Sequence, residues 1–553
     1  MTKVLSPVSS AVQAISSRTD QYFHNVTSNK SVVRSVDHNV GSEEALLAEI
    51  GYKQELKRHY NTLETFGIAF SIMGLLPSIS STVAGGLECG PGGLVWGWLF
   101  SGFFVLLIGI SMTMLASSLP TSGGLYYWTN FYCPDKYRVP LSFVIGISNS
   151  LALCGGLCSI SYGFAAEVLA AVSVNNDGAF SITQGKLYGV FAACVICACA
   201  LCCITTKHGS YLQTLSIFVN SFIIILFFIA VPIGASKHGF NDRGFIFGDL
   251  TNVRTWPKGW SWMLSMMPAI WTIGGFDSVV HMSEELKSKK SIPWGILGSI
   301  SVCWIVGWCI CVVIVACIKG GDIAAVLESA TGSPMAQVIY DALGKKWCVA
   351  FMSLISLGQF LMACSIALAA SRQIWAFARD DGTPFIYRII KYVDPRVKVP
   401  INATIFAAAL SCFIGLLILI NTTAANALFS LAVAGNYLAW GMPVFLVLLP
   451  YGKQKFVPGP FHFGPVVSTI INVLTVLWIV FIIVLCMFPD NKSVTKETMN
   501  YTVVINCGIW LLAVIYYFAY GYRIYSGPKS NLDTIDGESE SNDNLDQILD
   551  EKA

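Results

Sequence analysis

Charged side chains are scarce in this chain. Only 12% of its 553 residues are Asp, Glu, Lys or Arg, about half the share found in a typical soluble domain. Hydrophobic residues make up 54%, and they come in long blocks, without the polar face that a soluble helix needs. This composition argues against several water-soluble domains, although the length alone would suggest them.

A charge imbalance and reactive motifs are missing as well. The formal net charge is only +2, so we expect no nucleic-acid partner. Nearly all of the 18 cysteines lie inside apolar runs, and the Cys194-x-x-Cys197 spacing has no histidine or carboxylate beside it. The chain has no phosphate-binding P-loop, which argues against an ATP-driven pump. Because no reactive group of side chains is visible, we expect no enzyme, no catalytic residues, no metal site and no cofactor.

Long apolar blocks recur along the chain. A helix needs ~20 mostly apolar residues to cross ~30 Å of hydrocarbon. About twelve blocks have that length: residues 65–83, 94–115, 141–172, 188–204, 212–233, 262–282, 293–318, 348–378, 401–420, 427–449, 465–488 and 501–520. We therefore expect an all-α membrane protein of about twelve transmembrane helices embedded in a lipid bilayer. The third and eighth are long enough to be tilted or to extend past the bilayer.

Two polar segments flank these blocks. Residues 1–61 have no apolar stretch near their start, so we expect a cytoplasmic tail and no cleaved signal peptide. Residues 525–553 are acidic, which predicts a disordered tail, and residues 62–524 form the expected transporter domain. With a cytoplasmic N-terminus, the inner loops hold roughly twice as many Lys and Arg residues as the outer loops, which predicts that both termini are cytoplasmic. Plasma membrane and vacuolar membrane both remain possible.

Helix-breaking residues interrupt the first and the sixth block. The first contains Gly74 and Pro77, and the sixth contains Gly274 and Gly275. Lipid offers no partner to the backbone groups that a break frees, so a break at membrane depth is tolerated where it lines a polar cavity. There the freed N–H groups can hold a carboxylate and the freed carbonyls an ammonium, which suits a zwitterionic substrate.

The two breaks lie five blocks apart, which is the spacing of a five-plus-five inverted repeat. The alternative is that these residues only permit close helix packing. Asp277 follows the second break directly, and an acid at this depth is usually functional or paired. Its alternative role is to hold the unwound backbone by hydrogen bonds.

Six segments carry a resemblance to a known family: residues 46–58, 67–78, 117–128, 271–278, 371–380 and 429–436. At these residues the chain resembles the amino acid–polyamine–organocation superfamily, and within it the fungal amino acid/choline transporter group and its GABA (γ-aminobutyrate) permease type. The resemblance extends from about residue 46 to about residue 528. It implies secondary transport by alternating access with proton coupling.

In related bacterial amino-acid antiporters, the break in the first helix cradles the substrate carboxylate and an aromatic residue of the sixth helix covers the substrate. The resemblance therefore implies a carboxylate cradle, an aromatic cover and a backbone that faces the ammonium. In this chain these parts are Ser71, Ile72, Met73 and Gly74, then Trp271, and finally Ile273 and Gly274.

Other polar residues are weaker candidates. Tyr162, with Ser161, could line the cavity, and Glu167 is expected to be an interfacial acid. Gln359 could contribute to coupling or gating, although it and Asn436 more commonly would hydrogen-bond between helices.

A short acidic motif follows the sixth block. His281, Glu284 and Glu285 form a string similar to a metallopeptidase signature, but the second histidine is absent. We expect the two glutamates to pair with Lys287, Arg372 or Arg379 during closure, together with Asp277 as coupling or gating groups. The alternative is a solvated charged loop.

We predict a proton-coupled permease for amino-acid-like substrates, with GABA as the leading substrate. Choline would need cation–π contact with Trp271 or Tyr162, and polyamines would need more acids in the cavity; both remain alternatives on the same fold. A nutrient receptor that keeps the fold without transport is the alternative from a different class.

Overall fold

A computed structural model describes residues 55–56, 58–204, 209–329, 331–394, 398–495 and 499–529. The expected N-terminal tail up to residue 54 and the expected acidic tail beyond residue 529 lie outside the described residues. Several basic residues used in the orientation argument also lie outside them: Lys53, Lys57, Lys207, Arg396 and Lys496.

The described residues are helical and contain no strand, apart from one isolated bridge between Tyr60 and Leu286. Within the described ranges, 11 helices are long and apolar enough to cross a membrane. They are α3 (Thr62–Met73) with α4 (Leu75–Leu87), α5 (Gly90–Ser118), α7 (Asp135–Asn175), α8 (Gln184–Ile204), α9 (Gly209–Ala235), α14 (Ser299–Ala316) with the preceding π-helical turn η3 (Trp294–Gly298), α17 (Lys345–Arg379), α19 (Ile401–Ile414) with η5 (Gly415–Leu419), α20 (Thr422–Leu448), α22 (Pro465–Leu485) and α23 (Thr502–Ala519). The expectation of an all-helical membrane protein is confirmed.

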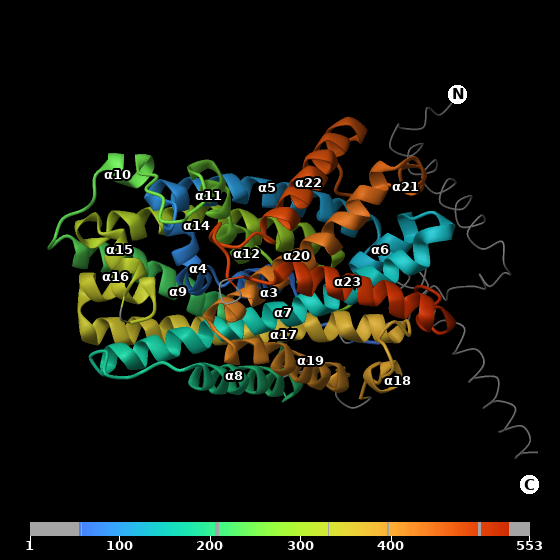
Figure 1. Cartoon of the computed structure of the whole chain (residues 1–553). Helices are drawn as coiled ribbons and strands as arrows, with labels where there is room; N and C mark the ends of the chain where they lie inside the picture. The colour runs from blue at the N-terminus through green and yellow to red at the C-terminus, as the bar shows by residue number, and fades with distance from the viewer. Residues whose placement is uncertain are drawn as a thin grey trace, which may run out of the picture. The chain divides into compact units, whose positions relative to one another are not determined.

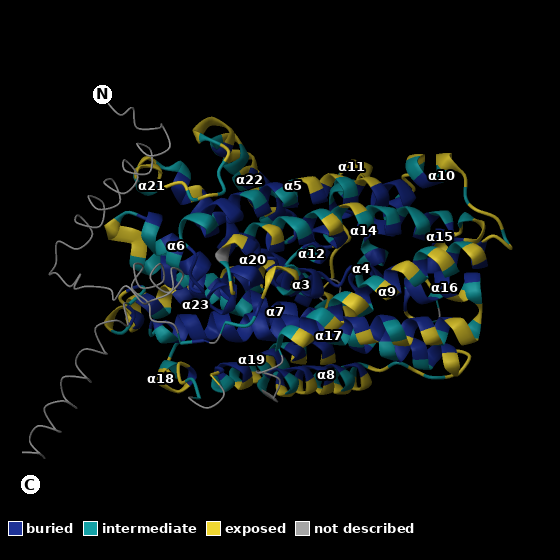
Figure 2. Ribbon diagram, turned by 180° about the vertical axis from the view of Figure 1, so that it is seen from behind, coloured by how far each residue is buried: buried dark blue, intermediate teal, exposed yellow. Residues whose placement is uncertain are grey.

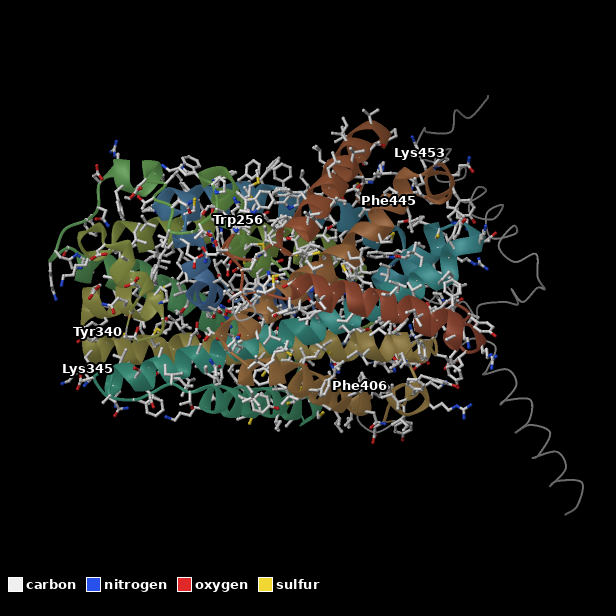
Figure 3. The ribbon with its side chains drawn as sticks, in the orientation of Figure 1. Trp256, Tyr340, Lys345, Phe406, Phe445 and Lys453 are labelled. Carbon is white, nitrogen blue, oxygen red and sulfur yellow. The ribbon has the colours of Figure 1, made fainter. Side chains whose placement is uncertain are left out.

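Shorter helices gather at the two ends of the long ones. In Figure 1, α6 (Gly124–Tyr132), α18 (Tyr387–Ile390) and α21 (Pro450–Lys455) lie at the right end, which we call the first face. At the left end, called the second face, lie α10 (Arg243–Gly248), α15 (Ile323–Leu327) and α16 (Pro334–Leu343). Lys453 and Lys345 mark these two ends in Figure 3.

The expected sixth helix, residues 262–282, is not continuous. It is divided into α11 (Lys258–Leu264), α12 (Met267–Thr272) and α13 (Ser278–His281), followed by the 3-10 turn η1 (Ser283–Glu285). The physical reason is Gly275, whose φ of 72° lies in the left-handed region and cannot continue a right-handed helix. The interruption at the expected glycines is therefore present, and within the described residues 11 helices reach the spanning length where about twelve were expected.

Two long helices, α7 and α17, form the centre of the bundle and pack side by side. They contain 41 and 35 residues, which correspond to roughly 60 and 50 Å of helix. Both were expected to be long enough to extend past a bilayer. Figure 2 shows that much of their surface is buried.

Helix α9 buries three polar side chains and exposes a row of large apolar ones. It buries Gln213, Ser216 and Asn220. Its exposed large apolar side chains recur every three or four residues: Tyr211, Leu215, Phe218, Phe222, Ile225, Ile229 and Ile233. A continuous apolar stripe of this length on a soluble protein would face water at high cost, so its natural surrounding is lipid.

Both ends of the described chain lie at the first face. Tyr60, just before α3, accepts a hydrogen bond from Lys287 through its carbonyl oxygen at 2.9 Å. Near the other end, the Lys529 ammonium is 2.7 Å from the Asp381 carboxylate, just after α17. Tyr525, at the start of the expected tail, is buried and its hydroxyl lies 3.0 Å from that of Ser142.

Candidate functional site

Gly74 separates α3 from α4. Its backbone has φ 38° and ψ 64°, a left-handed conformation that glycine adopts without a steric cost. The Gly74 N–H donates to the Phe70 carbonyl oxygen at 3.0 Å and so ends α3. No side chain caps the start of α4, where the first N–H groups of a helix lack partners within the helix. The first break therefore presents backbone donors, from Leu75 and Leu76, beside the cavity described below.

The second break spans the residues between α12 and α13. The Ile273 N–H donates to the Ala269 carbonyl oxygen at 2.9 Å, which closes the last turn of α12. Helical hydrogen bonding resumes at Asp277, whose carbonyl oxygen accepts from the Val280 N–H at 2.8 Å. Between them the backbone turns through Gly275 with positive φ.

The two breaks touch each other. A Cβ atom added to Gly275 would lie only 2.5 Å from Cγ2 of Ile72, in the last turn of α3. Because contacts below about 3 Å between carbon atoms are strongly repulsive, this position requires glycine for space as well as for its φ angle. The sequence spacing thus brings the two interrupted helices together at one place.

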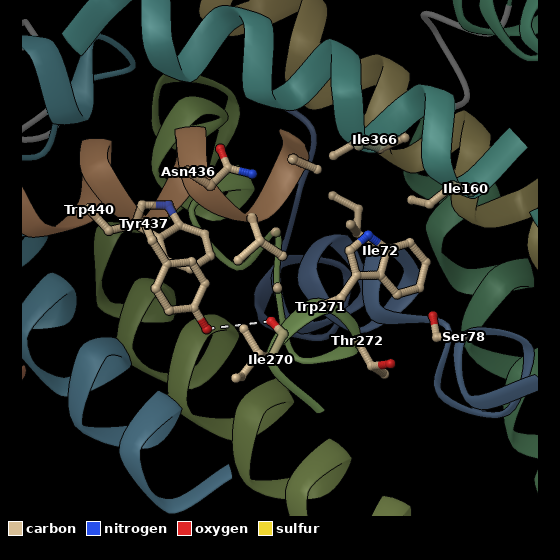
Figure 4. A pocket seen from close by; sticks show the side chains of 15 residues that line it. Ile72, Ser78, Ile160, Ile270, Trp271, Thr272, Ile366, Asn436, Tyr437 and Trp440 are labelled. Atoms are coloured by element: carbon tan, nitrogen blue, oxygen red, sulfur yellow. Dashed lines mark hydrogen bonds between the residues drawn. The ribbon is translucent and has the colours of Figure 1, made fainter. Parts of the chain in front are cut away.

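A cavity of about 40 Å³ lies beside the breaks (Figure 4). Its lining is mostly apolar and carries no charged side chain: Ile72 and Ser78 from α3 and α4; Gly156 and Ile160 from α7; Ile270, Trp271, Thr272, Gly274 and Gly275 from the second break; Ile366 from α17; and Ala432, Val433, Asn436, Tyr437 and Trp440 from α20. Pockets that hold small ligands measure ~300–1,000 Å³, so this cavity has room for a few water molecules only.

Trp271 is held at the edge of the cavity by two other helices. Its indole N–H donates to Ser159 Oγ of α7 at 3.2 Å. Its ring meets that of Phe429 of α20 edge-on, with centroids 4.7 Å apart. Beside it, the Tyr437 hydroxyl donates to the Ile270 carbonyl oxygen at 3.4 Å, the dashed line in Figure 4.

The expected binding residues divide into two groups. Ile72, Trp271 and Gly274 line the cavity. Ser71, Met73, Gly74 and Ile273 belong to the two breaks but are not among its lining residues, and neither are Tyr162 and Ser161. Tyr162 instead packs against Phe429, with ring centroids 6.2 Å apart.

Two buried ion pairs lie at the first face, beyond the second break. Arg372 Nε is 2.7 Å from Glu285 Oε1, and its Nη2 is 3.4 Å from Oε2 of the same carboxylate. Arg379 Nη1 is 3.3 Å from Glu284 Oε2. Arg372 and Arg379 are two of the three expected partners, and both lie within the last turns of α17. The glutamates are at most 7% exposed in their side chains, so a solvated loop is excluded.

The segment between α5 and α6 contacts the same acids. The Ser122 N–H donates to Glu284 Oε1 at 3.4 Å, and Ser122 Oγ accepts from the Glu284 N–H at 3.4 Å. The resembling segment 117–128 therefore contains a structural contact to this ion-pair layer.

Another ion pair, at the second face, was not predicted from the sequence. Arg254 Nη2 is 2.7 Å from Glu88 Oε2, at the end of α4, and also donates to the Gly85 carbonyl oxygen at 2.8 Å. Burial raises the pKa of the Glu88 carboxyl above its usual range, although the nearby Arg254 opposes that shift. No sequence pattern joins the two residues, which are far apart along the chain.

Asp277 is fully buried and is partnered by residues that the sequence reasoning did not assign to it. His281 Nε2 lies 3.3 Å from Asp277 Oδ2, and Asn149 Nδ2 of α7 donates to the same oxygen at 3.2 Å. Asn149 Nδ2 also donates to Asn436 Oδ1 at 3.2 Å. The spacing of an acid and a histidine four residues apart was the one signal in the sequence.

Gln359 and Glu167 lie on the side of the cavity toward the second face. Gln359 is fully buried, and its Nε2 donates to the Ile160 carbonyl oxygen at 3.1 Å, which joins α17 to α7. Glu167 is 2% exposed and accepts from Ser81 Oγ at 3.2 Å. Glu167 is therefore buried within the protein, while its depth in the membrane stays a prediction.

Comparison with known proteins gives a consistent result. The profile of a family described as amino acid permease matches residues 60–510. The chain is 54% identical to the GABA-specific permease of Saccharomyces cerevisiae over 515 residues, 92% of this chain and 90% of that one. It is 32% identical to an uncharacterized amino-acid permease of Schizosaccharomyces pombe, over 89% of this chain and 90% of that one. It is also 28% identical to a putative polyamine transporter of Candida albicans, over 95% of this chain and 96% of that one.

Proposed function

The chain belongs to the amino acid permease family, and from this membership we propose that it carries GABA across a membrane together with protons. It is a multi-pass membrane transporter and not an enzyme. The observation that carries the substrate proposal is the 54% identity to a GABA-specific permease over nine-tenths of both chains.

The geometry of the breaks supports a zwitterionic substrate. The N–H groups at the start of α4 and the partial positive charge of that helix end suit the carboxylate, next to the proposed cradle of Ser71, Ile72, Met73 and Gly74. The carbonyls at the end of α12, around Ile273 and Gly274, suit the ammonium. Trp271 would cover the substrate, with Tyr162 supporting it through Phe429.

Substrate entry must enlarge the cavity, because about 40 Å³ is far below the volume of a typical small-ligand pocket. The ion pairs of Glu284 and Glu285 would close the first face, and the Glu88–Arg254 pair would close the second face. At the first face, where both pairs are buried, separating a pair costs about 3–5 kcal/mol unless water reaches the freed charges. The cost is smaller at the second face, because the Glu88 side chain is 31% exposed. We therefore propose that each pair opens in turn, when its own face admits water, with Gln359 in the layer between α7 and α17.

We further propose twelve membrane crossings, with the broken segment from α11 to α13 as the sixth, arranged as a five-plus-five inverted repeat. An even number of crossings agrees with the position of both described chain ends at the first face. The excess of Lys and Arg supports a cytoplasmic first face. Tags placed at each end of the full chain, probed in intact and permeabilised cells, test this orientation, and microscopy separates plasma membrane from vacuolar membrane.

Polyamines and choline remain competing substrates. The relative described as a putative polyamine transporter keeps the first of these open, but the cavity lining contains no acid to hold several ammonium groups. Choline could bind through cation–π contact with Trp271. The absence of a carboxylate on both ligands would leave the donors at the start of α4 unused, which is why we favour GABA.

A substrate panel in transporter-deficient fungal cells tests the proposal. We expect uptake of labelled GABA, competition by short ω-amino acids, and little competition by choline or polyamines. Trp271→Ala should reduce GABA uptake, whereas Trp294→Ala is the matched control because Trp294 is 70% exposed on the outer surface. Normal expression without uptake of any of these compounds would favour a nutrient receptor.

A further inference from the structure

In the buried pair formed by Asp277 and His281, both ring nitrogens of His281 face oxygen atoms that can accept hydrogen bonds. His281 Nε2 faces Asp277 Oδ2, and its Nδ1 faces the Ser122 carbonyl oxygen at 3.3 Å. A carbonyl oxygen only accepts hydrogen bonds, and an ionised carboxylate also only accepts. A neutral imidazole carries one N–H, and an ionised Asp277 carries no proton. If His281 were neutral and Asp277 ionised, one of the two contacts would therefore place two acceptors against each other.

Both contacts become hydrogen bonds when the pair holds one additional proton. Either the imidazole is doubly protonated beside a carboxylate, or Nε2 of a neutral imidazole that carries its proton on Nδ1 accepts a hydrogen bond from a protonated Asp277. In both forms the pair has no net charge. The arrangement in this structure is therefore that of the proton-loaded pair.

The surroundings isolate this pair from other charges. The ionisable side chains on the elements packed around α13 include Glu64 of α3, Glu284 and Glu285 of η1, Arg372 and Arg379 of α17, and Tyr126 and Asp380 at the first face; Lys345 and Lys346 begin α17 at its opposite end. The glutamates of η1 pair with the two arginines, Glu64 accepts from the Asn61 N–H, and the Tyr126 hydroxyl donates to Asp380 at 2.7 Å. Among the described residues, His281 is the one cationic group paired with Asp277.

Loss of the proton would leave a net negative charge at a place where both side chains are fully buried. An unpaired charge inside a membrane protein is strongly unfavourable. The pair would thus release its proton only when a conformational change lets water reach it. This ties the proton to the opening and closing of the protein.

The pair also lies between the cavity and the first-face ion pairs. On one side, Asn149 links Asp277 to Asn436, which lines the cavity. On the other side, Ser122 links His281 to Glu284. A change in the charge of the pair therefore acts on the segment that lines the substrate cavity and on the layer that closes the first face.

We propose that Asp277 and His281 together form the site that binds the transported proton. The proposal rests on the proposed proton-coupled GABA transport and names the residues that carry the proton. One proton binds from the side open to water, shared between His281 Nε2 and Asp277 Oδ2, and leaves unchanged on the other side, so no bond other than its own N–H or O–H forms or breaks.

The test separates two kinds of transport by the full chain in proteoliposomes. Counterflow exchanges labelled external GABA for unlabelled internal GABA and needs no net proton movement, whereas accumulation driven by a pH gradient does. We expect His281→Gln and Asp277→Asn to keep measurable counterflow, to lose accumulation by about tenfold or more, and to lose the pH dependence of the counterflow KM. His238→Gln, a change in the loop after α9, is the control and should behave as the unmodified protein.

The outcomes are distinct. Absence of counterflow in the unmodified, folded protein contradicts the proposed GABA transport itself. If His281→Gln shows the same counterflow and the same accumulation as the unmodified protein, the proposed proton site is overturned while the proposed GABA transport stands. If both variants fail to fold, the test uses the unmodified protein. A counterflow KM that stays constant between about pH 5 and pH 8, the range in which histidine titrates, also overturns the proposed proton site.

Discussion

Gly275→Ala tests whether the two breaks form one packed site. Residue 275 has φ 72°, and an L-residue in the left-handed region costs about 1–2 kcal/mol. Its new Cβ would lie 2.5 Å from Ile72 Cγ2, and such overpacking costs about 1–3 kcal/mol. We therefore expect a loss of roughly 2–5 kcal/mol in stability.

Gly178→Ala is a matched control. Gly178 has φ 79°, and a Cβ there would meet nothing within 4 Å, so this variant carries the backbone cost without the clash. Apparent melting temperatures of the detergent-purified proteins, measured at one scan rate because unfolding of such proteins is commonly irreversible, should fall clearly further for Gly275→Ala.

The double variant Gly275→Ala with Ile72→Ala tests the contact directly, because Ile72→Ala removes the Cγ2 atom that the new Cβ would meet. The double variant should be more stable than the sum of the two single losses predicts, by about 1–3 kcal/mol. Equal effects of Gly275→Ala and Gly178→Ala, together with additive losses in the double variant, would refute the contact between the breaks.

Three further predictions follow from the site. Trp271→Phe should raise the GABA KM less than Trp271→Ala. For Trp271→Ala, loss of the aromatic contact corresponds to roughly 0.5–1.5 kcal/mol, or a two- to twelvefold rise in KM. Equal KM values for the two variants would contradict the role of Trp271 as an aromatic cover. Arg372→Gln should destabilise the protein by about 3–5 kcal/mol, because it leaves Glu285 buried without its cation, and Arg372→Gln with Glu285→Gln should recover part of that loss. Burial raises the pKa of Glu88, so its contribution to stability should be fully present near pH 4 and decline as pH rises through the raised value. The melting temperature of Glu88→Gln, relative to that of the unmodified protein, should therefore rise from about pH 4 to about pH 7.

The long apolar blocks predicted the helical membrane fold because a spanning helix needs a minimum apolar length that few other structures require. At the sixth block, apolar length alone was not sufficient, and the glycines were needed to predict the interruption. Apolar content there is high enough, but Gly275 makes the backbone turn, and the helix pieces on either side are short. The sequence shows the positions of the glycines, but it does not show the lengths of the helical segments on either side of them.

Part of the site could be predicted from the family resemblance. It assigned Ile72, Trp271 and Gly274 to the substrate, and all three line the cavity. Asn149 and Asn436 were not assigned to Asp277, since their meeting depends on how α7 and α20 pack against α13. Tyr162 was placed in the cavity from its helix alone, but Ile160, two residues earlier and thus on another side of the helix, lines it instead.

The most direct test of proton-coupled GABA transport uses the purified full chain in proteoliposomes with acidic buffer outside and neutral buffer inside. The account predicts that labelled GABA accumulates above its external concentration, that a protonophore abolishes this accumulation, and that protons enter the vesicles with it. Entry of GABA only up to the external concentration, unaffected by the pH gradient, would contradict the central claim.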